Sequence, residues 1–240
     1  MAKQSDPDFR PLVRWFWYAV VGGPTLLVLL LLLTWAGLFG SLPSTEEIAN
    51  PKSYLATEII TSDNRQLGTF FTENRVHADF EELPPHLVQA LVATEDERFF
   101  DHGGIDFRSL ARAVVKLGSD GGGSTITQQL AKNLLLSGER TLLRKGQEWV
   151  ITMALETFLS KKKILTLYLN HVEWGQGIFG AEAAAQHYFQ KPAAKLSAWE
   201  AARLAVMLPR PRYFEKLPQS VYLSDRAETI MARMNDVALP

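Results

Sequence analysis

The sequence predicts a mainly α-helical domain with a small N-terminal β-hairpin, preceded by one transmembrane helix. Three observations predict this class: an uncharged run near the N-terminus, two short β-like runs after it, and apolar residues at helical spacing from Pro84 onward. The 240 residues are enough for one membrane segment and one domain with its own core. The chain has no cysteine, which excludes disulfides, zinc-thiolate sites and cysteine nucleophiles. Its formal net charge of -1 says nothing about partners, so any electrostatic site is local. We expect no nucleic-acid partner.

The first element is an uncharged run from Trp15 to Thr45, which is densest in leucine between Leu26 and Leu33. A bilayer core needs about 20 apolar residues in a helix, so we predict a transmembrane anchor at 15–40. A cleaved signal peptide is the alternative, but its apolar region is only about 7 to 15 residues long. Because lysine and arginine precede the run, residues 1–14 are predicted to be a disordered cytoplasmic tail, with the domain outside the membrane.

A polar linker with two prolines is predicted at 41–55, and the domain is predicted over 56–240. The domain begins with two β-like runs, Ala56 to Thr61 and Leu67 to Thr72, separated by Ser-Asp-Asn-Arg-Gln. This pattern predicts a β-hairpin. No strand is predicted after it.

Helices account for the rest of the domain. The apolar spacing predicts helices over 86–97, 107–117, 124–135, 143–159, 161–170, 180–189, 197–207 and 222–235. Ser124 or Thr125 can cap the helix that follows a glycine-rich break, and Ser197-x-x-Glu200 has the spacing of a capping box.

Three consecutive acids, Glu95, Asp96 and Glu97, end an apolar helix just before Phe99 and Phe100. A solvated helix end is the simplest interpretation. However, adjacent helical residues point about 100° apart, so one acid can face a cleft while its neighbours form ion pairs. A carboxyl beside the phenylalanines would be partly desolvated, which would raise its pKa toward a value useful for proton transfer.

A glycine-rich segment, residues 121–123, precedes a helix that begins with clustered hydroxyl and amide side chains. Free backbone N–H groups at such a helix start suit anions, and the polar side chains can bond sugars or phosphates. A flexible loop followed by an N-cap is the alternative. No Gly-Lys-Ser/Thr follows, so this is not a Walker sequence.

Between Lys132 and Lys163 the chain has seven Lys or Arg residues against three Glu, although the whole chain is near neutral. This excess suits a pyrophosphate site, because Arg and Lys are the usual phosphate partners. A solvated basic face or attraction to anionic lipid is the alternative. Leucines lie among these charges, which suggests a surface that dips into the bilayer.

Five motifs follow one another in order between about residues 80 and 212: Glu95-Asp96-x-x-Phe99-x-x-His102-x-Gly104, Gly123-Ser124-Thr125-Ile126-Thr127-Gln128-Gln129-Leu130-x-Lys132-Asn133, Arg144-Lys145-x-x-Glu148, Ser160-Lys161-x-x-Ile164-Leu165-x-x-Tyr168-Leu169-Asn170 and Gly180-x-x-x-Ala184-Ala185-x-x-Tyr188-Phe189. Together they resemble the peptidoglycan glycosyltransferase family, the domain shared by monofunctional transglycosylases and class A penicillin-binding proteins. The resemblance implies a lysozyme-like helical fold with a membrane-dipping jaw beside a long cleft.

The resemblance also implies a reaction. The substrates would be lipid II and the growing glycan chain, and the product would be a linear strand with inverted configuration and released undecaprenyl pyrophosphate. Glu95 matches the base that deprotonates the acceptor 4-hydroxyl, and Glu148 matches a second essential acid that orients basic residues or a divalent cation such as Mg²⁺. The other expected substrate-binding residues are Asp96, Ser124, Thr125, Gln128, Gln129, Lys132, Asn133, Arg140, Arg144 and Lys145; of these, Lys132, Arg140 and Lys145 match positions that hold the departing pyrophosphate.

The expected location is the bacterial inner membrane, with membrane lipids and cell-division or elongation proteins as further partners. Two departures from the family are visible. Gln190 stands where relatives usually have glycine, and Ser53 to Glu82 resembles the start of a class A penicillin-binding protein whereas Leu208 to Pro240 resembles a monofunctional transglycosylase. The Ser-x-x-Lys at Ser160 to Lys163 has no transpeptidase domain around it, so we expect no penicillin-binding activity. A lysozyme-like glycan hydrolase and an inactive lipid II-binding scaffold remain as alternatives.

Overall fold

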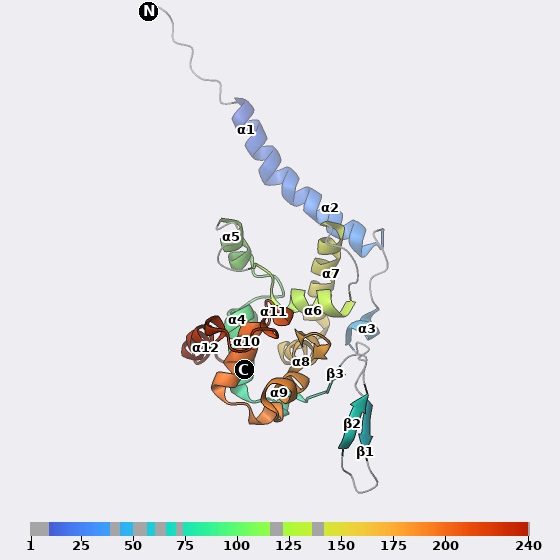
Figure 1. Ribbon diagram of the computed structural model, residues 1–240. Coiled ribbons are helices and arrows are strands. Elements are labelled where there is room, and N and C mark those ends of the chain that lie inside the picture. The colour runs from blue at the N-terminus through green and yellow to red at the C-terminus, as the bar shows by residue number, and fades with distance from the viewer. Residues whose placement is uncertain are drawn as a thin grey trace, which may run out of the picture.

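The computed structural model describes residues 10–38, 44–49, 57–60, 66–70, 74–115, 122–135 and 142–239. Within these ranges the protein is mainly helical with two small sheets, which confirms the predicted fold class. A helical rod at the N-terminal end projects from a globular domain, and the C-terminus lies within that domain (Figure 1).

The rod consists of α1 (Arg10–Trp17), a π-helical turn η1 (Tyr18–Gly22) and α2 (Gly23–Trp35). It begins at Arg10, so the last residues of the predicted disordered tail are helical. Its segment Val13–Trp35 spans 23 residues with a mean hydropathy of 2.1, which is long and apolar enough to cross a membrane. The rod is therefore compatible with a single-pass anchor.

Part of the predicted linker is a short helix, α3 (Thr45–Ala49). Ser44 caps it, because the Glu47 backbone N–H donates to Ser44 Oγ at 3.2 Å and the Ser44 N–H donates to Glu47 Oε2 at 2.8 Å. Ile48 is buried, and both α2 and α3 pack against α7 (Leu142–Phe158). The linker prediction named no helix here, although the Ser-x-x-Glu spacing of Ser44 and Glu47 indicates a helix start.

The predicted hairpin is confirmed by β1 (Thr57–Ile60) and β2 (Gln66–Phe70), which pair antiparallel. The expectation of no later strand was wrong. β3 (Asn74–Arg75), β4 (Glu173–Gly175) and β5 (Ile178–Phe179) form a second sheet in the order β3-β5-β4, with β3 parallel to β5. Strands of two or three residues are too short for an alternating pattern to show in the sequence.

One helical layer packs α4 (Pro85–Glu95) against α10 (Ala198–Met207) and α12 (Val221–Met234). Leucines of α4 are fully buried against alanines of α10, whose small side chains allow the helix axes to approach closely. This packing fixes α4, and with it the position of Glu95 at its C-terminal end.

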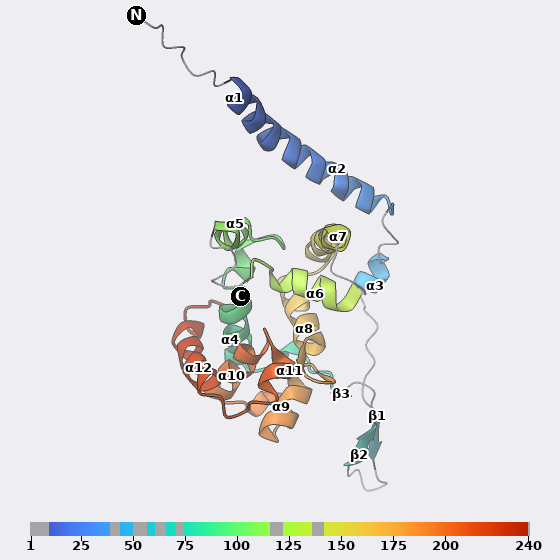
Figure 2. The ribbon, with the colours of Figure 1, turned by 45° about the horizontal axis from the view of Figure 1, so that its top comes forward.

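A second layer packs α6 (Ile126–Leu135) against α7 and α8 (Lys161–His171). Ser160 caps α8, since its Oγ accepts from the Lys163 N–H at 3.2 Å, so the Ser-x-x-Lys here is a helix start. The two layers lie side by side in both views (Figures 1 and 2).

The remaining helical elements of the domain are η2 (Phe80–Glu82), η3 (Phe99–Asp101), α5 (Phe107–Val115), α9 (Ala181–Phe189), η4 (Ala193–Lys195) and α11 (Pro211–Phe214). The predicted capping box of α10 is confirmed, because the Ser197 N–H donates to Glu200 Oε2 at 2.7 Å and the Glu200 N–H donates to Ser197 Oγ at 3.3 Å. Gln190 ends α9 in the left-handed region with φ 57°, where glycine is usual.

Candidate active site

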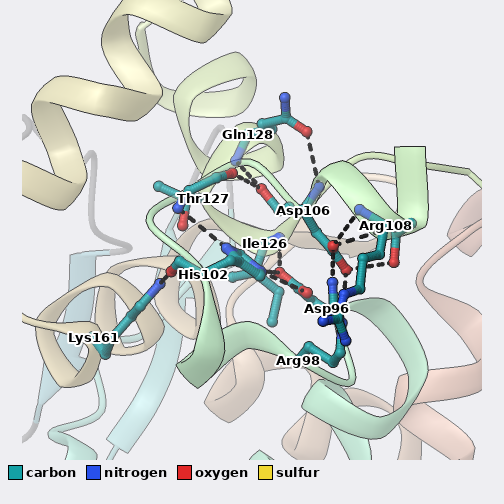
Figure 3. Close-up of polar contacts among 12 residues, drawn as sticks. Asp96, Arg98, His102, Asp106, Arg108, Ile126, Thr127, Gln128 and Lys161 are labelled. Carbon is teal, nitrogen blue, oxygen red and sulfur yellow. Dashed lines mark hydrogen bonds and ion pairs between the residues drawn. The ribbon is translucent and has the colours of Figure 1, made fainter. Parts of the chain in front are cut away.

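Asp96 joins the end of α4 to the beginning of α6 (Figure 3). Its buried carboxylate accepts from the Ile126 backbone N–H at 3.1 Å and from His102 Nε2 at 2.9 and 3.0 Å. His102 Nδ1 accepts from the Gly104 N–H at 3.1 Å, so Nε2 carries the proton that His102 donates to Asp96. A carboxylate at a helix N-terminus is also favoured by the helix dipole. Asp96 therefore positions the two helices, and its expected contact with substrate stays a prediction.

Gly104 brings the loop before α5 close to α7. Its φ is +90°, and a Cβ there would lie 2.7 Å from Thr152 Cγ2 and 2.9 Å from Glu156 Cγ. Its carbonyl accepts from Thr125 Oγ1 at 2.6 Å. Only glycine fits this position without displacing α7, which explains its place beside His102.

Thr125 and Gln128 form the cap of α6. The Gln128 N–H donates to Thr125 Oγ1 at 3.2 Å, and the Thr125 N–H donates to Gln128 Oε1 at 3.0 Å. The predicted cap is thus at Thr125. Both side chains are buried, so they anchor the helix, and their expected contacts with substrate stay predictions. Ser124 and Asn133, in contrast, are exposed.

Glu95 lies at the C-terminal end of α4, opposite Gln129 of α6. Its Oε2 accepts from Gln129 Nε2 at 2.7 Å, whereas Oε1 is buried and has no hydrogen-bond partner among the described residues. Burial raises the pKa of Glu95, and the neighbouring Asp96 raises it further, while the Gln129 hydrogen bond and the charge of Lys132 lower it. A carboxylate with one oxygen hydrogen-bonded and the other without a partner has an acceptor left for a proton.

Glu148 forms ion pairs with two cations of α7, Lys145 and Arg144. Its carboxylate is buried, contacts Lys145 Nζ and lies 3.6 Å from Arg144 Nη1. Lys145 Nζ also lies 3.5 Å from Ser124 Oγ, so this cation flanks the start of α6. Two cations around one carboxylate leave a net positive charge that can attract an anion.

The described basic residues between Lys132 and Lys163 do not form one cluster, which corrects the expectation from their spacing in the sequence. Lys161 Nζ donates to the His102 carbonyl at 2.6 Å and to Glu156 at 2.8 Å (Figure 3). Lys162 pairs with Glu81 of η2. Both cations are engaged in structural pairs: the partner of Lys162 is 81 residues away in the sequence, whereas Glu156 lies only five residues before Lys161. Lys132 is exposed, and Arg140 lies outside the described residues.

Sequence reasoning missed two features of the site. Tyr168 of α8 donates from its hydroxyl to Gln129 Oε1 at 2.9 Å, and nothing in the helical spacing indicated where this hydroxyl points. Asp106 pairs with Arg98 and accepts from Ser109 Oγ at 2.5 Å (Figure 3). Burial alone would raise the pKa of Asp106, but the bonds from Ser109 and Arg98 lower it to about 2.

A divalent cation would have few ligands from the protein itself. The part of the chain that the structure describes contains no group of three or more His, Asp or Glu side chains able to hold a metal. A surface hollow lined by Glu81, Pro85, Glu182 and Pro192 shares no residue with the site around Glu95.

A helical domain with a buried carboxylate that keeps one oxygen unbonded, and with a separate carboxylate that holds two cations, suits an enzyme that transfers sugars. A model of the Transglycosylase family matches residues 63–235, so the chain belongs to this family of glycosyltransferase enzymes.

Similar proteins indicate which kind of transglycosylase the chain resembles. The chain is 52% identical over 165 residues to a biosynthetic peptidoglycan transglycosylase of Janthinobacterium sp. (strain Marseille), covering 67% of this chain and 71% of the relative. It is also 52% identical to the protein of that name from Herminiimonas arsenicoxydans, with the same coverage, and 50% identical to one from Burkholderia thailandensis, covering 67% and 64%. Penicillin-binding protein 1A from Haemophilus influenzae matches with a TM-score of 0.40 and 22% identity over 77% of this chain and 18% of that chain, a likeness too low to assign the fold.

Proposed function

We propose that this chain polymerises lipid II into linear peptidoglycan strands, with inversion at the anomeric carbon and release of undecaprenyl pyrophosphate. The names of the relatives support the biosynthesis of peptidoglycan. The observation that carries the proposal is Glu95, whose buried Oε1 has no hydrogen-bond partner among the described residues while Gln129 binds Oε2.

In the proposed reaction Glu95 Oε1 takes the proton of the acceptor sugar's 4-hydroxyl. The hydroxyl oxygen attacks the anomeric carbon of the growing chain, and the bond from that carbon to the lipid pyrophosphate breaks. A single displacement without a covalent enzyme intermediate inverts the configuration. The raised pKa of Glu95 makes its carboxylate a stronger base than an exposed glutamate.

Lys145 and Arg144, held by Glu148, are proposed to bind the departing pyrophosphate. Negative charge grows on the leaving oxygen in the transition state, and cations fixed in advance stabilise it there more than in the ground state. Lys132 and Arg140 are proposed to complete this set.

We propose that Mg²⁺ or a similar divalent cation accompanies the pyrophosphate. Mg²⁺ often binds through one or two carboxylates plus substrate phosphates and keeps several waters, so Glu148 alone fits as its protein ligand. Such an ion would supply charge stabilisation of the leaving group.

The rod is proposed to cross the inner membrane with its N-terminus in the cytoplasm. Helix α5 lies on the side of the domain that faces the rod (Figures 1 and 2), and exposes Phe107, Val114 and Val115. These apolar side chains support contact with membrane lipids, where a lipid-linked substrate resides. Cell-division or elongation proteins are proposed as further partners.

The test is turnover of labelled lipid II by the purified full chain in detergent. We expect long glycan strands together with released undecaprenyl pyrophosphate. Cleavage of mature wall glycan without polymerisation would instead support a hydrolase, and binding of lipid II without turnover would support a scaffold.

A further inference from the structure

Three side chains from three helices form a continuous hydrogen-bonded chain. Tyr168 of α8 donates from its hydroxyl to Gln129 Oε1 of α6 at 2.9 Å. Gln129 then donates from Nε2 to Glu95 Oε2 of α4 at 2.7 Å. Tyr168 is only 1% exposed, so no water competes for its hydroxyl from bulk solvent.

We propose that Tyr168 is a positioning residue for the catalytic base: its hydroxyl orients the Gln129 amide so that the amide N–H faces Glu95. This inference rests on the proposed role of Glu95. It adds to that role a residue that does not itself touch the substrate.

The orientation matters because an amide has a donor end and an acceptor end. Turned by half a rotation, Gln129 would bring its oxygen against the carboxylate of Glu95, which would repel it. A donor fixed at Oε1 prevents this rotation, and a buried hydroxyl is such a donor. Burial, and then the carboxylates of Glu95 and Asp96, raise the pKa of Tyr168 well above its usual 10, so the hydroxyl keeps its proton wherever Glu95 titrates.

Fixing the amide has two consequences for the base. It holds Oε2 and leaves Oε1 free to take a proton. It also lowers the pKa of Glu95, because the bond favours the ionised form. The other charged groups that face Glu95 are Asp96, which raises this pKa, and Lys132 of α6, which lowers it. Loss of the Tyr168 hydroxyl should therefore raise the pKa of Glu95.

The experiment compares the full-length enzyme with Tyr168→Phe, Gln129→Met and the double variant, measuring kcat and KM for lipid II across pH. We expect Tyr168→Phe to lower kcat by about 3- to 10-fold, as for loss of one hydrogen bond, with KM nearly unchanged. We expect the acid limb of its pH profile to move to higher pH. The double variant should be no worse than Gln129→Met, because both changes break one chain.

Tyr188→Phe is the matched control. It also removes a hydroxyl bonded within the domain, to the Trp174 carbonyl at 2.8 Å, but that hydroxyl has no link to Glu95. We expect wild-type kcat and an unmoved acid limb. If Tyr168→Phe does not fold, the test uses Gln129→Met alone, and the quantity measured is the pH at which the acid limb of its kcat profile falls.

An unchanged kcat and acid limb in Tyr168→Phe, or full additivity in the double variant, would overturn the positioning role. An unmoved acid limb in Gln129→Met would do the same. Glu95→Gln separates this failure from that of the proposed function. If Glu95→Gln is inactive, only the role of Tyr168 has failed; if it is fully active, the assignment of the base has failed.

Discussion

The Ile126 backbone N–H donates to the Asp96 carboxylate at 3.1 Å, and this bond fixes the start of α6 against the end of α4. Glu95 directly precedes Asp96, and Gln129 lies one helical turn after Ile126. The bond therefore sets the separation at which Gln129 meets Glu95. His102 reinforces the junction from the adjoining loop, because it donates to the same carboxylate.

Gly104→Ala should destabilise the domain by about 2 to 4 kcal/mol. The substitution adds a side chain at a positive φ and forces a Cβ to 2.7 Å from Thr152 Cγ2. The measurement is the free energy of unfolding in denaturant. Gly103→Ala is the control, since a Cβ at Gly103 meets nothing within 4 Å. Equal stability of the two variants would show that Gly104 is not required for close packing.

Asp106 should make the domain sensitive to acid. Its pKa is about 2 in the folded chain against an ordinary 3.8, so the ionised form is the one that folding favours. The stabilisation is complete above about pH 4 and is lost as the pH falls toward 2. Asp106→Asn should lower the free energy of unfolding by up to about 2 kcal/mol at pH 7, and by much less near pH 2.

Asp236→Asn, at an exposed carboxyl after α12, provides the comparison and should change stability by about 0.5 kcal/mol or less. A deficit for Asp106→Asn that is equally large at pH 7 and pH 2 would argue against this account of Asp106.

Glu148→Gln should lower kcat by about 100- to 1000-fold, the loss expected when charge stabilisation of a transition state is removed. The reason is that Lys145 and Arg144 would lose the carboxylate that orients them. Glu156→Gln, two turns further along α7, is the control because Glu156 pairs with Lys161 at 2.8 Å. The control should lose stability but keep its kcat. Similar kcat values for both variants would contradict the separate roles of the two acids.

Most helices could be predicted because their apolar spacing is a local property. The helix predicted at 161–170 is observed at Lys161–His171, and the helix predicted at 143–159 is observed at Leu142–Phe158. The start of helix α3 could also be predicted, from the capping pair Ser44 and Glu47. Its apolar spacing gave no signal, because the helix is only five residues long and apolar spacing needs a longer window. The short strands β3, β4 and β5 are defined by their pairing with one another in one sheet. No local sequence pattern therefore predicts them.

The site was less predictable than the fold. Ordered motifs singled out Glu95 and Glu148, but they could not say which side chains face each other. Thr125 and Gln128 turned out to be buried in the cap of α6, whereas their neighbour Gln129 meets Glu95. The basic residues between Lys132 and Lys163 bind different partners for the same reason. Lys162 pairs with Glu81, which is 81 residues away, and Lys161 donates to the distant His102 carbonyl, and charge counted along a sequence does not contain that information.

Gln190→Gly should raise the free energy of unfolding by about 1 kcal/mol. Gln190 has φ 57°, a conformation that costs a residue with a Cβ about 1 to 2 kcal/mol and that glycine adopts freely. Gln186→Gly, at an exposed position inside α9, should instead lower it by about 1 kcal/mol. Thermal unfolding of both variants measures the difference, and destabilisation by Gln190→Gly would refute the account of this helix end.

Glu95 is the proposed base, and the initial rate of lipid II polymerisation by Glu95→Gln tests this role most directly. The glutamine keeps the size of the side chain and can still bond Gln129, but it cannot accept the proton at Oε1. We predict that Glu95→Gln folds and binds lipid II while its rate falls by at least about 100-fold, the lower range of a general-base contribution. A folded Glu95→Gln enzyme that polymerises lipid II at the wild-type rate would contradict this role.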